Sequence, residues 1–329
     1  MGGINLKAWI SAARLRTLPL SISGIIVGSV YSYLIMNIDP SDTTVSLKPE
    51  DTARYFKWII PLMGLITTLG FQILSNLAND YGDGVKGTDN DRRQGPMRAL
   101  QSGVITARQM KTAIIITAFL TLISTVILIA TSLGWDQIPM SLFFLALGVA
   151  AIWAAIKYTV GDNAYGYRGL GDLFVFIFFG PVSVLGISYL ITHELHPMLL
   201  LPAITVGLLS VAVLNLNNMR DAENDASVGK NTLVVKLGLR KARAVHFILL
   251  TTAFLSTAIF IIYLNNLVFQ SFRYSLLLPL LAFVVIAVHV RKLTVTLQPK
   301  DLDPELKKVA LATFFFSLLA ALSVYIVLV

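Results

Sequence analysis

Two short acidic stretches carry most of the side chains in this sequence that could do chemistry. The first stretch is NLANDYGDGVKGTDND, residues 76–91, and the second is NLNNMRDAEND, residues 215–225. Each begins with asparagines at the end of an apolar run and continues into aspartates. The second therefore looks like a degenerate copy of the first, about 140 residues later, and the pair suggests one shared site.

Helical spacing places part of the first stretch on one face. If the preceding apolar run continues as a helix, Asn76, Asn79 and Asp83 lie at positions i, i+3 and i+7. Asp80 is then turned away from that face by about a quarter-turn or more. Three glycines are expected to end this helix: Gly82, Gly84 and Gly87. Asp89 would then lie in a loop that can fold back toward the helix end.

The second stretch places Asp221 and Asp225 at i and i+4, again on one helical face. Carboxylates at this spacing repel each other, and Mg²⁺ would offset the repulsion. Mg²⁺ prefers oxygen ligands and is commonly held by one or two carboxylates together with substrate phosphates. Two facing carboxylate groups could hold magnesium ions around one diphosphate and neutralise its charge as it leaves. Several loop cations could contact the phosphate oxygens: Arg92, Arg93, Arg98, Arg220 and Lys230.

The aspartates of the two stretches have two simpler explanations. The aspartates could be solvated loop residues that balance nearby lysines, and for a single aspartate this explanation would be the better one. The pairing of two similar clusters, both flanked by asparagines, argues against it. A calcium-binding loop of the EF-hand type requires ligands at positions 1, 3 and 5, Gly at 6 and Glu at 12. Starting from Asp80, Asp83 or Asp89, that spacing fails.

A third polar segment, KYTVGDNAYGYRGLGD, residues 157–172, contains Tyr158, Tyr165 and Tyr167. Tyrosines are common anchors at a membrane interface. They could equally wall an aromatic pocket, hydrogen-bond a phenolic substrate and shield a carbocation with their ring faces. The sequence leaves both explanations open. The histidines are weak signals, and His246 and His289 are expected to be helix-end residues.

The elements that must position these residues are membrane helices. The chain of 329 residues is 56% hydrophobic and 13% charged, with a mean hydropathy of +0.74, whereas soluble domains carry about 25% charged residues. Cysteine is absent, which excludes disulfides and thiolate metal sites. We expect an all-α integral membrane protein. Nine apolar segments free of Asp, Glu, Lys and Arg are long enough to span a bilayer: approximately 17–36, 58–79, 112–132, 138–156, 173–192, 198–218, 244–264, 274–290 and 309–329.

The distribution of basic residues predicts the orientation in the membrane. With nine spans, the N-terminus and both acidic stretches lie on the same side of the membrane. This side carries 22 of the 26 Lys and Arg residues, and the opposite side carries 4. By the positive-inside rule the first side is cytoplasmic. The net charge of +8 is therefore explained by topology and by contact with the lipid bilayer, and nucleic-acid binding is not expected. A transporter is disfavoured, because transporters place ionisable groups within their spans, and these predicted spans contain no acids.

Four stretches resemble the UbiA-type intramembrane prenyltransferases. They are NLANDYGDGVKGTDNDRRQGPMRALQSG (76–103), NNMRDAENDASVGKNTLVVKLG (217–238), RLRTLP (14–19) and YTVGDNAYGYRGLGDLFVFIFFGPV (158–182). The last aspartate of the first motif is displaced to Asp89, as in the branch that prenylates 1,4-dihydroxy-2-naphthoate for menaquinone. The resemblance implies one helical bundle, residues 1–329, around a central cavity and capped by cytoplasmic loops. Its two degenerate halves would carry motif loops at about 76–98 and 215–236.

The resemblance also implies a reaction and a site. It implies Mg²⁺-dependent transfer of a polyprenyl group from polyprenyl diphosphate to 1,4-dihydroxy-2-naphthoate in a cell membrane, with loss of CO₂. Related branches use other acceptors such as 4-hydroxybenzoate. The implied ligands of Mg²⁺-diphosphate are Asn79, Asp83, Asp221 and Asp225. Assisting residues would be Asn76, Asp80 and Asp89, and phosphate contacts would be Arg16, Arg98 and Lys230.

Overall fold

The computed structural model describes residues 5–38, 56–90, 97–134, 136–295 and 298–329. Within these ranges the regular structure is entirely helical, and nine segments are long and apolar enough to cross a membrane. Five of the nine are single helices: α2 (Leu18–Met36), α4 (Ile59–Val85), α5 (Ala107–Leu133), α6 (Ile138–Lys157) and α13 (Leu302–Leu328). The expected nine spans are therefore confirmed, and the observed helices extend up to nine residues beyond their predicted ends.

The other four spans combine an α-helix with a tighter or wider helical turn. Their parts are α7 (Gly171–Ile177), η3 (Phe178–Val182) and α8 (Ser183–Thr192); η4 (Pro197–Leu199) and α9 (Leu200–Ser227); α11 (Leu239–Tyr263) and η5 (Leu264–Val268); and η6 (Tyr274–Leu281) and α12 (Ala282–Val295). Short elements connect or precede the spans: α1 (Leu6–Ala13), η1 (Leu15–Thr17), η2 (Tyr165–Arg168), α10 (Leu233–Leu237) and η7 (Pro299–Asp301). The acidic stretches lie at the ends of α4 and α9, and the span that contains α9 is the longest of the nine.

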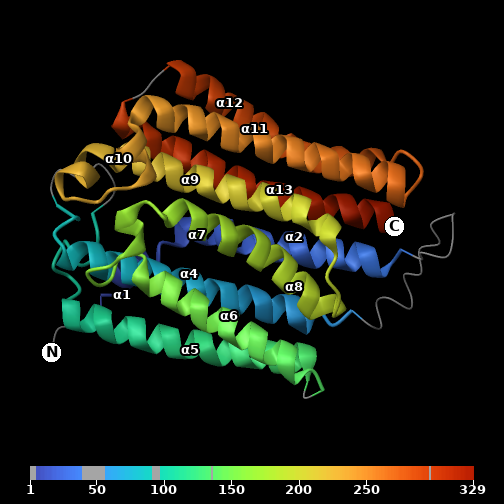
Figure 1. The fold of residues 1–329 in the computed structure, drawn as a ribbon, viewed down its shortest axis with the longest axis horizontal. Coiled ribbons are helices and arrows are strands. Elements are labelled where there is room, and N and C mark those ends of the chain that lie inside the picture. Colours follow the sequence, from blue (N-terminus) through green and yellow to red (C-terminus); the bar gives the residue numbers. More distant parts are fainter. Residues whose placement is uncertain (1–4, 39–55, 91–96, 135, 296–297) are drawn as a thin grey trace.

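The long helices lie side by side along the longest axis of the molecule (Figure 1). α5 and α6 form one side of the bundle, α11 and α12 form the other, and α9 and α13 lie between. α9 packs against α11 and α13, while α2 packs against α8 and α13. The end of α4, the end of α9 and α10 all lie at the same end of the bundle in Figure 1. This arrangement brings the two acidic stretches together.

Small residues allow α2 and α8 to pack closely. Gly24 and Gly28 are one helical turn apart on α2, and both face α8. A Cβ on Gly28 would lie 2.5 Å from the backbone oxygen of Val184 and 2.4 Å from a side-chain carbon of Ile187. Lipid tails provide no hydrophobic drive for helix association, so membrane helices rely on such close packing of small residues.

The first acidic stretch stays helical for longer than its glycines suggest. α4 continues through Gly82 and Gly84 to its end at residue 85, so the expectation that these two glycines end the helix is wrong. A Cβ on Gly82 would lie 2.7 Å from the backbone carbonyl carbon of Thr159. Gly82 therefore lets α4 approach the segment that follows α6. The chain turns away only at Gly87, whose φ is +72°.

Two histidines are interior helix residues, which corrects the expectation that they lie at helix ends. His246 in α11 and His289 in α12 are fully buried, and their Nε2 atoms are 2.9 Å apart. His289 Nδ1 is 2.9 Å from a carboxylate oxygen of Glu305 on α13. The other oxygen of Glu305 pairs with Lys292 and Lys308. This cluster joins α11, α12 and α13 beside the same end of the bundle.

Gly28→Ala is expected to destabilise the bundle by roughly 1–3 kcal/mol, because the added methyl group overpacks the contact with the backbone of α8. The matched control is Gly186→Ala on α8, where an added Cβ would lie 3.7 Å from a ring carbon of Phe144, an ordinary van der Waals contact. We expect the control to leave stability unchanged or raise it by up to about 1 kcal/mol. The measurement is thermal unfolding in detergent. Equal unfolding temperatures for the two variants would contradict this account of the α2–α8 contact.

Candidate active site

A cavity of about 360 Å³ lies inside the bundle, with polar residues at one end and apolar residues farther in. Acids and amides of both acidic stretches line its polar end: Asn76, Asn79, Asp83, Asp89, Asn217, Asp221, Asn224 and Asp225. Three cations line the same end, namely Arg14, Arg98 and Lys230. The inner walls are formed by residues such as Ile25, Leu128, Ile129, Phe144, Ile187 and Leu190. The cavity thus combines a charged mouth with an apolar interior.

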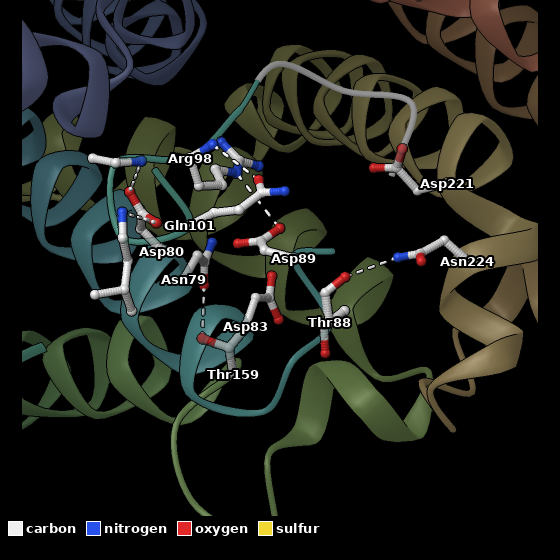
Figure 2. A network of polar contacts seen from close by, with 12 residues as sticks. Asn79, Asp80, Asp83, Thr88, Asp89, Arg98, Gln101, Thr159, Asp221 and Asn224 are labelled. Carbon is white, nitrogen blue, oxygen red and sulfur yellow. Dashed lines mark hydrogen bonds and ion pairs between the residues drawn. The ribbon is translucent and has the colours of Figure 1, made fainter. Parts of the chain in front are cut away.

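The first acidic stretch presents the predicted face to this cavity. Figure 2 shows Asp83 and Asp89 beside each other, with Asp221 on α9 across from them. Asn79 lines the cavity, and its side-chain oxygen accepts a hydrogen bond from the Thr159 hydroxyl at 3.3 Å. Asn76 also lines it and donates a hydrogen bond to the backbone oxygen of Ala13 at 2.9 Å. Helical spacing alone is enough to bring these residues to one wall.

The chain after α4 folds back on the helix end, as the sequence predicts for Asp89. The backbone oxygen of Asp83 accepts hydrogen bonds from the amides of Thr88 at 2.9 Å and Asp89 at 3.4 Å. Asn224 on α9 donates to the backbone oxygen of Thr88 at 2.9 Å, which ties the two acidic stretches together (Figure 2). Asp89 is 8% exposed and lies 3.9 Å from Nε of Arg98.

Asp80 points away from the cavity, as its position in the helix indicates, and has a different set of contacts. Its two carboxylate oxygens accept hydrogen bonds from the backbone amides of Ala99 and Leu100, at 3.2 and 3.4 Å. Asp80 is 1% exposed and is not among the cavity-lining residues. Because Arg98 immediately precedes these amides, Asp80 holds the turn that presents Arg98 to the cavity (Figure 2).

The second acidic stretch contributes Asp221 and Asp225 to the opposite wall, with Asn217 and Asn224 beside them. Asp225 is 2% exposed, and its Oδ1 lies 3.5 Å from Nζ of Lys230. Its Oδ2 is buried and has no hydrogen-bond partner among the described residues. A buried carboxylate oxygen without a partner is costly, so Asp225 is suited to bind a cation from the cavity.

Lys230 lies between the two acidic stretches. Its Nζ is 3.9 Å from Asp83 and 3.5 Å from Asp225, and the residue is 8% exposed. Burial alone would lower the pKa of Lys230, but the Asp83 and Asp225 carboxylates raise it, and the net direction is upward. Lys230 therefore stays charged and links the carboxylates on the two sides of the cavity.

Tyr167 supports Asp83 from behind the cavity wall. Its hydroxyl donates a hydrogen bond to Asp83 Oδ1 at 2.8 Å and lies 2.5 Å from the Thr88 hydroxyl. Burial, and then the charge of Asp83, raise the pKa of Tyr167 well above its usual value, which keeps the hydroxyl protonated. The Lys86 ammonium lies 4.0 Å from the centre of the ring. Tyr167 is not among the cavity-lining residues.

The other two tyrosines do line the cavity. Tyr165 stacks on Phe174 with ring centres 4.1 Å apart, and Tyr158 meets Tyr165 edge-on at 5.4 Å. Burial raises the pKa values of both hydroxyls. The Tyr165 hydroxyl donates to the backbone oxygen of Ala154 at 2.9 Å, which fixes its ring. Aromatic faces therefore border the cavity close to the acidic end.

Not every residue singled out from the sequence reaches the cavity. Arg220 is 2% exposed, and its guanidinium binds protein side chains rather than lining the cavity. The side chain of Arg16 lies outside the described part of the structure, as do Arg92 and Arg93. Sequence reasoning missed Arg14, although it lies in the quoted stretch RLRTLP and lines the cavity.

Sequence reasoning also left out Asn217 and Asn224. Helical spacing could have identified them, because Asn217 and Asn224 lie at i−4 and i+3 from Asp221 and so share its helical face.

The donor set at this end of the cavity fits magnesium. No three His, Asp or Glu side chains of the described residues converge closely enough to bind a metal by themselves. Mg²⁺ does not require such a cage, since it is commonly bound by one or two carboxylates plus phosphate oxygens and water. Asp83 and Asp225, with the unpartnered Oδ2 of Asp225, supply oxygen ligands of that kind.

The fold and the site define an intramembrane helical bundle with paired acidic stretches at one end of a largely apolar cavity. The model of the UbiA prenyltransferase family matches residues 52–319. The chain is 38% identical to the 1,4-dihydroxy-2-naphthoate octaprenyltransferase of Haemophilus influenzae over 322 residues, 98% of this chain and 97% of the relative. It is 45% identical to the protein of the same name in Escherichia coli over 254 residues, 77% of this chain and 76% of the relative.

Solved structures show the same fold at low sequence identity. A UbiA homolog from Aeropyrum pernix K1 matches with a TM-score of 0.65 and 15% identity, covering 96% of this chain and 99% of that one. A UbiA homolog from Archaeoglobus fulgidus bound to GPP and Mg²⁺ matches with a TM-score of 0.62 and 14% identity, covering 97% and 99%. This chain belongs to the UbiA prenyltransferase family. The family resemblance of the motifs is confirmed.

Asp80→Asn is expected to loosen the turn that carries Arg98. The neutral side chain loses a charge-assisted acceptor, and hydrogen bonds to charged groups contribute roughly 1.5–3 kcal/mol. We therefore expect amide hydrogen exchange in the peptide containing Ala99 and Leu100 to accelerate by about 10- to 100-fold. Asp162→Asn, at an exposed acid in the loop after α6, is the control. Unchanged exchange in the Asp80 variant would show that the carboxylate does not hold the turn.

Proposed function

We propose that this protein transfers a polyprenyl group from polyprenyl diphosphate to 1,4-dihydroxy-2-naphthoate, with release of diphosphate and CO₂, as a step of menaquinone biosynthesis. The observation that carries the proposal is the pair of acidic stretches that face each other across one end of an otherwise apolar cavity. The names of the Haemophilus influenzae and Escherichia coli relatives support this acceptor. The Archaeoglobus fulgidus homolog bound to GPP and Mg²⁺ supports a prenyl diphosphate donor and a magnesium cofactor.

The diphosphate head of the donor binds at the acidic end. The ligands of Mg²⁺ would be Asn79 and Asp83 on α4 together with Asp221 and Asp225 on α9. Asp89 would lie beside them. Bound there, Mg²⁺ would neutralise the charge that grows on the diphosphate as it leaves. Side chains that donate to phosphate oxygens would be Lys230 and Arg98, with Arg16 as a further candidate. Asn76, whose side-chain amide donates a hydrogen bond to the backbone at the end of α1, would fix the wall beside them.

The remaining cavity walls serve the prenyl chain and the reacting carbon. The allylic carbon–oxygen bond breaks with both electrons going to the diphosphate, which leaves a cation that water would quench. Apolar side chains such as Leu128 and Phe144 exclude water from this part of the cavity. Tyr158, Tyr165 and Phe174 present aromatic faces where the cation forms. The electron-rich naphthoate ring then forms the new carbon–carbon bond, and loss of its carboxylate as CO₂ restores the aromatic ring.

We also propose the orientation of the protein and its organisation. The protein would lie in the cell membrane, and the excess of Lys and Arg at the end of the bundle that carries the acidic stretches supports a cytoplasmic orientation of this end. The cavity takes residues from α4 and from α9, one in each half of the sequence. Residues 1–329 would therefore act as one prenyltransferase unit with two degenerate halves, since neither half alone provides a complete site.

The proposal is tested with membranes that contain the protein, a polyprenyl diphosphate and 1,4-dihydroxy-2-naphthoate. We expect the prenylated, decarboxylated product to appear with Mg²⁺ and to disappear when Mg²⁺ is chelated. The measurement is chromatographic detection of the product. Mg²⁺-dependent prenylation of 4-hydroxybenzoate alone would keep the donor and the metal and replace the acceptor. No transfer to any phenolic acceptor would refute the proposed function.

Asp83→Asn and Asp221→Asn are each expected to lower turnover by about 10²- to 10³-fold, because each removes a carboxylate that would hold the Mg²⁺ that stabilises the leaving diphosphate. The matched control is Glu223→Gln, because Glu223 lies on α9 between Asp221 and Asp225 but is exposed on another face. The control should retain wild-type turnover, and all three variants should remain in the membrane. Near-normal activity of either aspartate variant would remove that residue from the proposed metal site.

A further inference from the structure

The guanidinium of Arg220 is enclosed by protein acceptors. Its Nε donates to Asp221 Oδ1 at 2.9 Å, and one terminal nitrogen donates to Asp221 Oδ2 at 2.7 Å and to Asn217 Oδ1 at 2.8 Å. The other terminal nitrogen donates to Asp303 Oδ1 at 2.5 Å. The Arg220 side chain is 1% exposed. With these partners in place, Arg220 faces a carboxylate of the site rather than the substrate.

The pairing of Arg220 with Asp221 requires support from elsewhere in the fold. The two residues are adjacent on α9, and side chains of adjacent helical residues do not face each other. A long arginine side chain also loses much conformational freedom when it is held in one position. Asn217, one turn earlier on α9, and Asp303, on α13, provide the two further contacts that hold the guanidinium beside Asp221.

Asp303 belongs to a helix outside both acidic stretches. It lies in the first turn of α13, and its side chain is 35% exposed, whereas the Arg220 side chain that it contacts is almost fully buried. Leu306, one turn farther along α13, lines the cavity, so the start of this helix borders the site. Asp303 therefore contacts the acidic site from α13 through an ion pair.

The contact with Arg220 determines how the Asp221 carboxylate is oriented. Each carboxylate oxygen has two lone-pair sites, and the guanidinium fork uses one on each oxygen. Asp221 also lines the cavity, so its carboxylate lies at the acidic end of the site. The fork also fixes the rotation of the carboxylate, which matters for Mg²⁺ because this ion demands near-ideal octahedral geometry. Partners of this kind commonly change metal affinity by about 10- to 100-fold when they are removed.

We propose that Asp303 is a positioning residue that acts through Arg220 to orient the Asp221 carboxylate toward Mg²⁺-diphosphate. This inference rests on the proposed function, because it assigns Asp221 to the metal site. Asp303 is not among the residues that line the cavity. Its removal releases the guanidinium from α13, so that Asp221 is no longer held in one orientation. The charge of Arg220 and the packing of α13 remain.

The test measures binding of inorganic diphosphate in the presence of Mg²⁺ by calorimetry on the purified full-length protein, together with the Mg²⁺ dependence of turnover. For Asp303→Asn we expect diphosphate binding to weaken by about 10- to 100-fold and the Mg²⁺ concentration for half-maximal turnover to rise. At saturating Mg²⁺, kcat should stay near the wild-type value. Asp303→Glu, which keeps the carboxylate, should restore most of the binding. Asp301→Asn, two residues earlier in η7, is the matched control and should bind like the wild type.

Arg220→Lys provides a second route to the same result, because it keeps the positive charge and loses the fork. It should weaken diphosphate binding as Asp303→Asn does, and the double variant should be no weaker than the Arg220 variant alone. Wild-type diphosphate affinity in both single variants, or additive losses in the double variant, would overturn the inference. A wild-type protein that binds no diphosphate with Mg²⁺ would overturn the proposed function itself.

Discussion

Repulsion between buried carboxylates is the constraint on which the site depends. Asp83, Asp89, Asp221 and Asp225 all border one end of a cavity within a helical bundle, and each is at most 8% exposed. Burying several like charges is expensive unless each is paired or hydrogen-bonded. The structure meets this requirement with one cation on each side, Arg98 beside Asp89 and Arg220 beside Asp221, and with Lys230 between Asp83 and Asp225.

The polar supports of these acids come from several separate elements. Asp83 accepts a hydrogen bond from the hydroxyl of Tyr167 in η2. The loop after α4 accepts one from the side-chain amide of Asn224 in α9, and Arg220 is held by the carboxylate of Asp303 in α13. Such contacts join segments far apart in the sequence at one end of the bundle. The apolar spans hold the helices in the membrane, and these contacts set the distances between the acidic stretches. The geometry of the acidic site therefore depends on residues well outside the two motifs.

The sequence predicts the membrane helices well because length and hydropathy determine them almost alone. Helical spacing also predicts which acids share a face, since Asp83 and Asp225 require only the 3.6-residue period to reach the cavity. The continuation of α4 through Gly82 could not be predicted, because this glycine permits close contact with the backbone of Thr159, which is distant in the sequence. The contacts of Arg220 with Asp221 and of Tyr167 with Asp83 could not be predicted for the same reason. Each depends on a partner that is distant in the sequence, and both residues turn toward a site carboxylate rather than toward the cavity.

The extent of the cavity along α4 has a consequence for how the protein meets its substrates. Gly64 and Asp83 both line it, and at about 1.5 Å of rise per residue they are roughly 28 Å apart along the helix. The hydrocarbon core of a bilayer is about 30 Å thick. In the proposed function, a lipid-like donor with its head at Asp83 can therefore extend its tail beside α4 across most of the bilayer. Encounter with such a donor is a two-dimensional search, governed by the number of molecules per area of membrane rather than by their concentration in water.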